Sequence, residues 1–449
     1  MKRTAVTEYG TVRGMQGCDA RITVYKGIPF AAPPVGENRW KAPKPPKAWE
    51  GEKECYTFGP IPVQDTPGMG DDLYCREWHV DCDLPMSEDC LYLNVWTPAK
   101  SPDEKLPVLI WYFGGGFQWG YTAEMEFDGE RIASRGIVVV GVSYRLGAIG
   151  FMAHPELTKE EGVSGNYGFL DQKAGLEWVV RNIAAFGGDP DRITISGQSA
   201  GGCSVMNQLT CEENFDKIKG AVILSGIIRF PQAERDKDLF CPTDLDKAEK
   251  KGEDFLAYLG VSNIEEARKL DAIFIRDKYA KYRDDHQTMF VGIKDGRFCV
   301  GDPVERIING DCAPCPIITG NTKDEFVFGG MNMVERSVKD TLDAAMDKDP
   351  SRKFYYYSFG PDIPGDDNPG CFHSCDLWFW FETLLKCRRA YQGRHFDLAR
   401  QMCNYISAFV KTGDPNCNDN DGTPQTEWKT YTKEQKGGLN FTGEGSIAI

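Results

Sequence analysis

Short runs of hydrophobic residues recur along the chain, separated by longer amphipathic stretches. Five of these runs have the length and the β-branched or aromatic content of buried strands, at positions 108–113, 137–144, 193–196, 221–224 and 316–319. In the stretches between them, hydrophobic residues recur every three or four positions, as on one face of a helix. Strands that alternate with helices in this way predict a mostly parallel sheet with helices on both faces, the α/β class.

The clearest predicted helix occupies residues 170–184. Its hydrophobic stripe ends just before a Gly-Gly pair and consists of Leu170, Ala174, Leu176, Val179, Val180, Ile183 and Ala184. Farther along, the pattern predicts a helix near 333–346 and a strand at 354–359.

Between a short β-branched run at 192–196 and a helical pattern at 203–209 lies the sequence Gly-Gln-Ser-Ala-Gly, residues 197–201. A G-x-S-x-G motif between a strand and a helix is typical of a tight turn that exposes the serine hydroxyl at the end of a sheet. Ser199 is therefore the candidate nucleophile.

A serine hydroxyl needs a base, and the chain has only five histidines, at 79, 154, 286, 373 and 395. In this strand–turn–helix context the order along the chain is serine, acid, histidine, which favours His373 as the base. His286 and His395 lie in polar or helical surroundings and are predicted to be at the surface. For the acid, both Asp324 and Glu325 follow the strand at 316–319, and spacing does not separate them.

Three consecutive glycines, 114–116, follow the strand at 108–113. Glycines at a strand end leave backbone N–H groups free to converge on one point, as a tetrahedral oxyanion requires.

The composition narrows the function further. Of 449 residues, 52 are Lys or Arg and 67 are Asp or Glu, a net charge of −15. Such an acidic chain disfavours nucleic acid and anionic membranes as partners. We find no apolar run long enough to span a bilayer and no signal-peptide pattern, so a cytoplasmic location with mostly reduced cysteines is expected.

Several segments together resemble the type B carboxylesterase family, which includes the cholinesterases. Residues 88–95 and 186–201 are similar to its two signature segments, and residues 114–117, 144–147, 165–172 and 411–416 agree with other family motifs. The resemblance spans the chain. It implies a single α/β-hydrolase domain over residues 1–449, with a shortened helical region between 326 and 372.

The resemblance also implies roles for individual residues. It selects Glu325 over Asp324 as the acid that orients His373, and it assigns the backbone N–H groups of Gly115, Gly116 and Ala200 to an oxyanion hole. It further implies ion pairs between Arg39 and Glu88 and between Arg145 and Asp171. Phe113 departs from the family, in which His or Tyr is frequent at this position, so the hydrogen bonding that steadies the glycine loop is in question.

The sequence therefore predicts a serine carboxylic-ester hydrolase that acts through an acyl-enzyme on small to bulky esters, including aromatic ones. An amidase or a lactonase could use the same residues, and a non-catalytic adhesion protein is the alternative from another class. No cofactor is required. A zinc site or a disulfide among Cys312, Cys315, Cys371 and Cys375 is the weaker interpretation of those residues. The sequence leaves the oligomeric state open.

Overall fold

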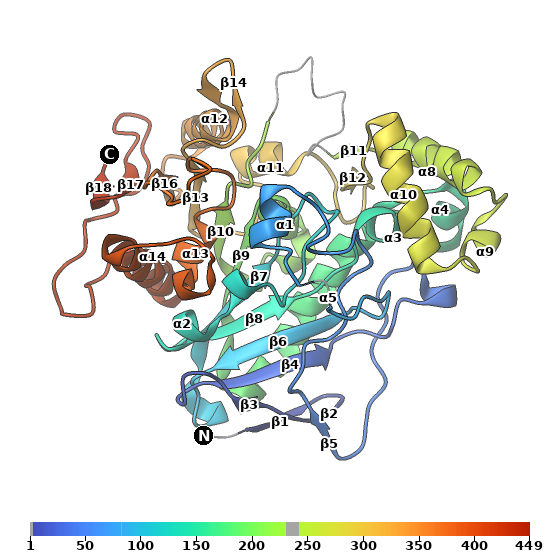
Figure 1. Ribbon diagram of the computed structural model, residues 1–449, viewed down its shortest axis with the longest axis horizontal. Coiled ribbons are helices and arrows are strands. Elements are labelled where there is room, and N and C mark those ends of the chain that lie inside the picture. Colours follow the sequence, from blue (N-terminus) through green and yellow to red (C-terminus); the bar gives the residue numbers. More distant parts are fainter. Residues whose placement is uncertain (1–2, 82, 230–241) are drawn as a thin grey trace.

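The computed structural model describes residues 3–81, 83–229 and 242–449. The described residues form one large sheet of 11 strands at the centre of the molecule (Figure 1). From one edge to the other, the strands are β18 (Gly445–Ala448), β17 (Gly438–Thr442), β16 (Phe354–Phe359), β13 (Ile317–Thr322), β10 (Ile218–Leu224), β9 (Gly188–Gln198), β7 (Leu106–Tyr112), β8 (Val138–Val142), β6 (Tyr92–Thr97), β4 (Thr23–Pro29) and β3 (Met15–Gln16).

The middle of this sheet is parallel, and its edges are antiparallel. Every neighbouring pair from β17 to β8 is parallel, whereas β18 and the strands β6, β4 and β3 are antiparallel to their neighbours. The five strands predicted from hydrophobic runs are β7, β8, β9, β10 and β13, which lie side by side in the sheet. Their continuous hydrophobicity follows from burial on both faces, because helices cover each side. The predicted α/β class is confirmed.

Two groups of helices cover the two faces (Figure 1). One group packs in succession and consists of α5 (Tyr167–Asn182), α6 (Ala200–Thr210), α11 (Pro303–Asn309) and α12 (Met333–Lys348). The other consists of α2 (Glu130–Ala133), α13 (Leu377–Trp380) and α14 (Gly393–Thr412). Both α6 and α14 contact β7 and β9, so the central strands have helical cover from each side.

The remaining elements lie around this core. Helices α8 (Leu245–Leu259), α9 (Ile264–Ala267) and α10 (Ala272–His286) gather at the right of Figure 1, near α3 (Gly147–Phe151) and α4 (Pro155–Glu161). Helix α1 (Leu73–Glu77) lies above the sheet. Short strands pair outside the main sheet: β1 (Thr4–Thr7), β2 (Gly10–Arg13) and β5 (Glu52–Glu54); β11 (Thr243–Asp244) and β12 (Ile293–Lys294); and β14 (Val327–Phe328) and β15 (Met331–Asn332).

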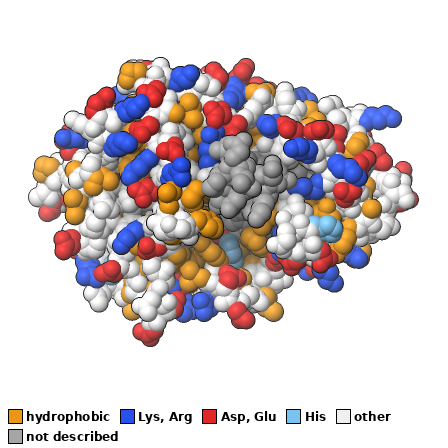
Figure 2. Space-filling model, turned by 90° about the horizontal axis from the view of Figure 1, so that it is seen from above, with side chains coloured by type: hydrophobic (Ala, Val, Ile, Leu, Met, Phe, Trp, Pro, Cys, Tyr) orange, Lys and Arg blue, Asp and Glu red, His pale blue; other side chains and the backbone are white. Residues whose placement is uncertain are grey.

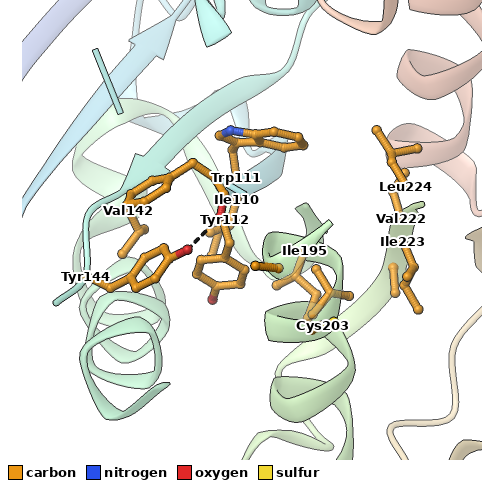
Figure 3. Packing of buried hydrophobic residues seen from close by; sticks show 14 of the residues in the cluster. Ile110, Trp111, Tyr112, Val142, Tyr144, Ile195, Cys203, Val222, Ile223 and Leu224 are labelled. Carbon is orange, nitrogen blue, oxygen red and sulfur yellow. Dashed lines mark hydrogen bonds between the residues drawn. The ribbon is translucent and has the colours of Figure 1, made fainter. Parts of the chain in front are cut away.

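Core packing holds the end of β7, which leads into the three glycines 114–116. The rings of Phe113 and Tyr144 stack with their centroids 4.3 Å apart, and the Tyr144 hydroxyl donates to the Phe113 carbonyl at 2.7 Å. Figure 3 shows Tyr144 with the dashed line that marks its hydrogen bond. The loop is therefore held at its first end although Phe113 brings no polar side chain.

Both ion pairs implied by the resemblance are present. Nε of Arg39 lies 2.6 Å from Glu88, and Nη2 of Arg145 lies 2.7 Å from Asp171, and all four side chains are buried. Arg39 also donates to the backbone carbonyl of Leu270 at 2.8 Å, which ties the N-terminal part of the chain to the segment between α9 and α10.

One histidine lies elsewhere than predicted. His286 is exposed as expected, but His395 is buried in α14, where its Nε2 lies 2.9 Å from the Asp362 carbonyl oxygen. The surface prediction for His395 is wrong. Its neighbour Arg394 is charged, but His395 lies on the inward face of the helix. None of the cysteines in the described part of the chain forms a disulfide.

Candidate active site

Ser199 lies at the turn between β9 and α6. Its φ is +55°, in the left-handed region that a serine rarely adopts, and its side chain is nearly buried. A Cβ at Gly197 would lie 2.3 Å from the Gly201 carbonyl oxygen, and one at Gly201 would lie 2.1 Å from the Tyr112 carbonyl oxygen. Only glycine fits at these two positions, so the motif allows the tight turn that the sequence predicted.

The structure brings His373 and Glu325 together although 48 positions separate them in the chain. Glu325 follows β13 and His373 follows β16, and these parallel neighbours end at the same edge of the sheet. Nδ1 of His373 contacts Oε2 of Glu325. The other carboxylate oxygen, Oε1, accepts from the Ser225 hydroxyl at 2.9 Å and from the Thr322 N–H at 2.8 Å.

The neighbouring acid has a different role. Oδ2 of Asp324 accepts from the backbone N–H of Cys371 at 2.7 Å, so Asp324 holds the loop that carries His373. The structure thus separates the two candidates that spacing left open, since the carboxylate of Glu325 is the one that contacts the imidazole.

Another acid, Asp376, lies buried near this pair. It accepts from the Tyr357 hydroxyl at 2.9 Å and from the indole N–H of Trp380 at 3.1 Å. Burial, and then the charge of Glu325, raise the pKa of Asp376 to about 6. Asp376 therefore gives up its proton at a pH closer to neutral than an ordinary aspartate does.

Nε2 of His373 faces the side chain of Gln198, with 3.2 Å between it and the amide nitrogen. With the N–H on Nδ1 directed at Glu325, Nε2 is an acceptor and Gln198 donates to it. Each ring nitrogen of His373 therefore has one partner. The partner of Nε2, Gln198, immediately precedes Ser199 in the chain.

The three predicted backbone donors lie around the same turn. Gly115 and Gly116 have φ of +101° and +62°, and Ala200 is the first residue of α6. We find no acceptor for the N–H groups of these three residues within the described ranges. Unpaired N–H groups at a helix N-terminus and in a glycine loop are suited to binding an anionic oxygen.

Ser199 and His373 line a cavity of about 820 Å³. Figure 2 shows hydrophobic side chains gathered around a histidine near the middle of this face. Trp119 lines the cavity, whereas Trp378 and Trp380 are buried in the core. Other residues that line the cavity are Gln64, Asp65, Asp72, Tyr74, Trp78, His79, Glu124, Phe127, Arg276, Met289, Phe326 and Leu377.

The sequence profile of the carboxylesterase family matches residues 2–357 and 337–447. The chain belongs to the carboxylesterase family. Over 98% of its length, it is 30% identical to the para-nitrobenzyl esterase of Bacillus subtilis, of which the match covers 95%. It is 42% identical to the fumonisin B1 esterase of Sphingopyxis macrogoltabida over 51% of this chain and 40% of that protein.

Solved structures agree with the family. A PNB esterase superposes with a TM-score of 0.84 at 26% identity, covering 100% of this chain and 97% of that one. The carboxylesterase EST55 of Geobacillus stearothermophilus gives 0.81 at 28% identity, with the same two coverages. The fold of this carboxylesterase-family protein is therefore the α/β-hydrolase fold, as the resemblance implied.

Sequence reasoning missed the partners of the predicted residues. Gln198 could have been noticed as the residue before the serine, but Ser225 and Tyr74 lie in segments with no motif. Among the described residues, no cluster of His, Cys, Asp and Glu could hold a metal ion. No helix in the same part of the chain could cross a membrane.

Proposed function

We propose that this carboxylesterase-family protein hydrolyses carboxylic esters through an acyl-enzyme on Ser199, with His373 as the base and Glu325 as the acid that orients it. One observation carries the proposal: Ser199 and His373 line the same cavity, and Nδ1 of His373 contacts the buried carboxylate of Glu325. That contact favours the tautomer in which Nε2 can accept a proton.

The reaction begins when the Ser199 hydroxyl attacks the ester carbonyl carbon and His373 takes the hydroxyl proton at Nε2. Glu325 stabilises the imidazolium that forms. Gln198 occupies Nε2 before substrate binds, so its amide is displaced as the Ser199 hydroxyl engages the base. The imidazolium then protonates the departing alcohol oxygen, and a water molecule hydrolyses the acyl-enzyme by the same steps.

The negative charge that develops on the carbonyl oxygen binds to the N–H groups of Gly115, Gly116 and Ala200. Because these donors are backbone groups held before the reaction starts, they need no reorganisation in the transition state. The free N–H groups at the turn support this role.

The substrate class follows from the cavity. A volume of about 820 Å³ and walls that include Trp78, Trp119, Phe127 and Phe326 suit esters with bulky or aromatic groups. The segment that contains Asp65, Asp72 and His79, with the short helix α1 inside it, forms part of the wall. We expect turnover of both small and bulky esters. The relatives include proteins called cocaine esterase and bile salt-activated lipase.

The test is Ser199→Ala together with an organophosphate probe. The variant should lose hydrolysis of a p-nitrophenyl ester by roughly 10⁴-fold or more while it keeps the wild-type circular dichroism spectrum. The probe should label Ser199 in the wild type. Label on another serine, or a variant that keeps a tenth of the rate, would contradict the proposal. Matched amide and lactone substrates measured beside the ester show whether ester hydrolysis is the preferred reaction.

A further inference from the structure

A second histidine–carboxylate pair lines the cavity. Nδ1 of His79 lies 2.9 Å from Oε1 of Glu124, and both residues face the space that Ser199 and His373 line. The side chain of His79 keeps 16% of its exposure, whereas that of Glu124 keeps 2%. The cavity therefore holds two imidazoles, and a buried carboxylate lies against Nδ1 of each.

The carboxylate of Glu124 is fixed in place. Its Oε1 also accepts from the backbone N–H of Tyr121 at 3.0 Å. The adjacent acid Glu126 is fully buried, and burial together with the charge of Glu124 raises the pKa of Glu126 well above its ordinary 4.5. Glu126 therefore holds its proton more tightly than an ordinary glutamate, and Glu124 is the carboxylate that contacts His79.

The charge of His79 is set by this contact. Burial by itself lowers the pKa of His79, but the charge and the hydrogen bond of Glu124, with a smaller contribution from Asp72, raise it above 6.5. Since Nδ1 is directed at Glu124, Nε2 is the polar atom left for a ligand. In the imidazolium form, Nε2 is a hydrogen-bond donor.

The segment that carries His79 packs against the loop of His373. The Tyr74 hydroxyl in α1 donates to the His373 carbonyl at 2.9 Å, and the ring of Trp78 meets Phe372 edge-on at 5.4 Å. In the proposed reaction His373 protonates the leaving oxygen, so the alcohol part of an ester lies on the side of the imidazole. His79 belongs to this segment and lines the same cavity, so the alcohol side is assigned to it.

We propose that His79 determines specificity for the alcohol, by donating from Nε2 to a second oxygen that the alcohol part of the ester carries. The preferred esters have a hydroxyl or carboxylate oxygen beyond the ester bond. The proposal rests on the proposed ester hydrolysis. A polar group among apolar walls disfavours a substrate that cannot form a hydrogen bond with that group. Around His79 the apolar side chains of Trp78, Phe127 and Leu377 line the same cavity.

The experiment uses three butanoate esters with one acyl group and different alcohols: butyl, 4-hydroxybutyl and 3-carboxypropyl. The selectivity is the ratio of kcat/KM for each polar ester to that for the butyl ester. In the wild type the ratio should exceed about ten for the preferred polar ester. Comparison of the 4-hydroxybutyl and 3-carboxypropyl esters shows whether a hydroxyl or a carboxylate binds to His79. His79→Phe, which keeps a flat ring but removes both nitrogens, should bring the ratio close to one.

His79→Gln, whose amide can still donate, should keep part of the selectivity, and this second variant serves if the phenylalanine variant does not fold. The matched control is His286→Phe on exposed α10, which should keep the wild-type ratio. Selectivity that stays unchanged in His79→Phe, or a wild type without preference for either polar ester, would overturn the proposal. Failure of the proposed hydrolysis is distinct, because then none of the three esters is cleaved.

Glu124→Gln distinguishes a charged donor from a structural role. Removing the charge favours neutral His79, so the selectivity should disappear at a lower pH than in the wild type. A merely structural contact would change the rate for all three esters and leave the pH dependence of their ratio as it was. That second result would also overturn the proposal.

Discussion

The amide nitrogen of Gln198 lies 3.2 Å from Nε2 of His373, while the opposite ring nitrogen contacts Glu325. The proposed base is thus in contact with a neutral partner on the serine side and a charged one on the acid side. A carboxylate in place of that neutral partner would favour the imidazolium, which is inactive as a base.

We predict that Gln198→Glu moves the acid limb of the kcat/KM profile to higher pH, because the added charge stabilises the protonated imidazole. The measurement is kcat/KM for one p-nitrophenyl ester between pH 5 and 9. Gln198→Met, which has a similar size and no charge, should leave the position of the limb unchanged. Identical profiles for Gln198→Glu and the wild type would contradict the arrangement seen here.

Relative to the wild type, the Glu126→Gln variant should become more stable as the pH rises. The folded protein raises the pKa of Glu126 above its ordinary 4.5, so the folded state holds a proton that the unfolded state has lost above that value. The wild type therefore loses stability relative to the glutamine variant as the pH rises above about 4.5. Urea denaturation at pH 5 and pH 8 should show a larger advantage of the variant at pH 8. An equal advantage at both pH values would contradict the raised pKa of Glu126.

Gly201→Ala should disrupt the turn at Ser199. The added Cβ would lie 2.1 Å from the Tyr112 carbonyl oxygen, a backbone atom of a central strand that cannot move aside easily. We expect loss of most hydrolysis, or of soluble protein. Gly162→Ala is the control for left-handed backbone without crowding, because its φ is +84° and a Cβ there would meet nothing within 4 Å. It should cost about 1 kcal/mol and leave activity intact.

Arg145→Met should destabilise the protein by about 3–5 kcal/mol, because it leaves the buried carboxylate of Asp171 without its cation. Guanidinium denaturation measures this loss. The double variant Arg145→Met/Asp171→Leu removes both charges and should recover much of the stability. If the single and the double variant lose equally, the charge of Asp171 is not the cause.

The sequence by itself determined the central strands and the turn at Ser199. Hydrophobic runs predict strands that are buried on both faces, and glycines at 197 and 201 predict a turn, because both depend on local sterics and solvation. The ion pairs Arg39–Glu88 and Arg145–Asp171 were implied by the resemblance to the carboxylesterase family. The same local reasoning was wrong for His395, whose burial depends on which face of α14 turns inward.

Without the family resemblance, the residues alone leave open which carboxylate meets which imidazole, and the tertiary structure decides it. Asp324 and Glu325 are adjacent in sequence and similar in chemistry, and their roles diverge because the loop after β13 directs one toward the backbone of Cys371 and the other toward His373. His79 and Glu124 are separated by 45 positions and come from segments without any motif, so no local pattern links them. His79 and Glu124 meet because the two segments that carry them line the same cavity. The packing of those segments depends on residues far away in the chain, so a local pattern does not predict it.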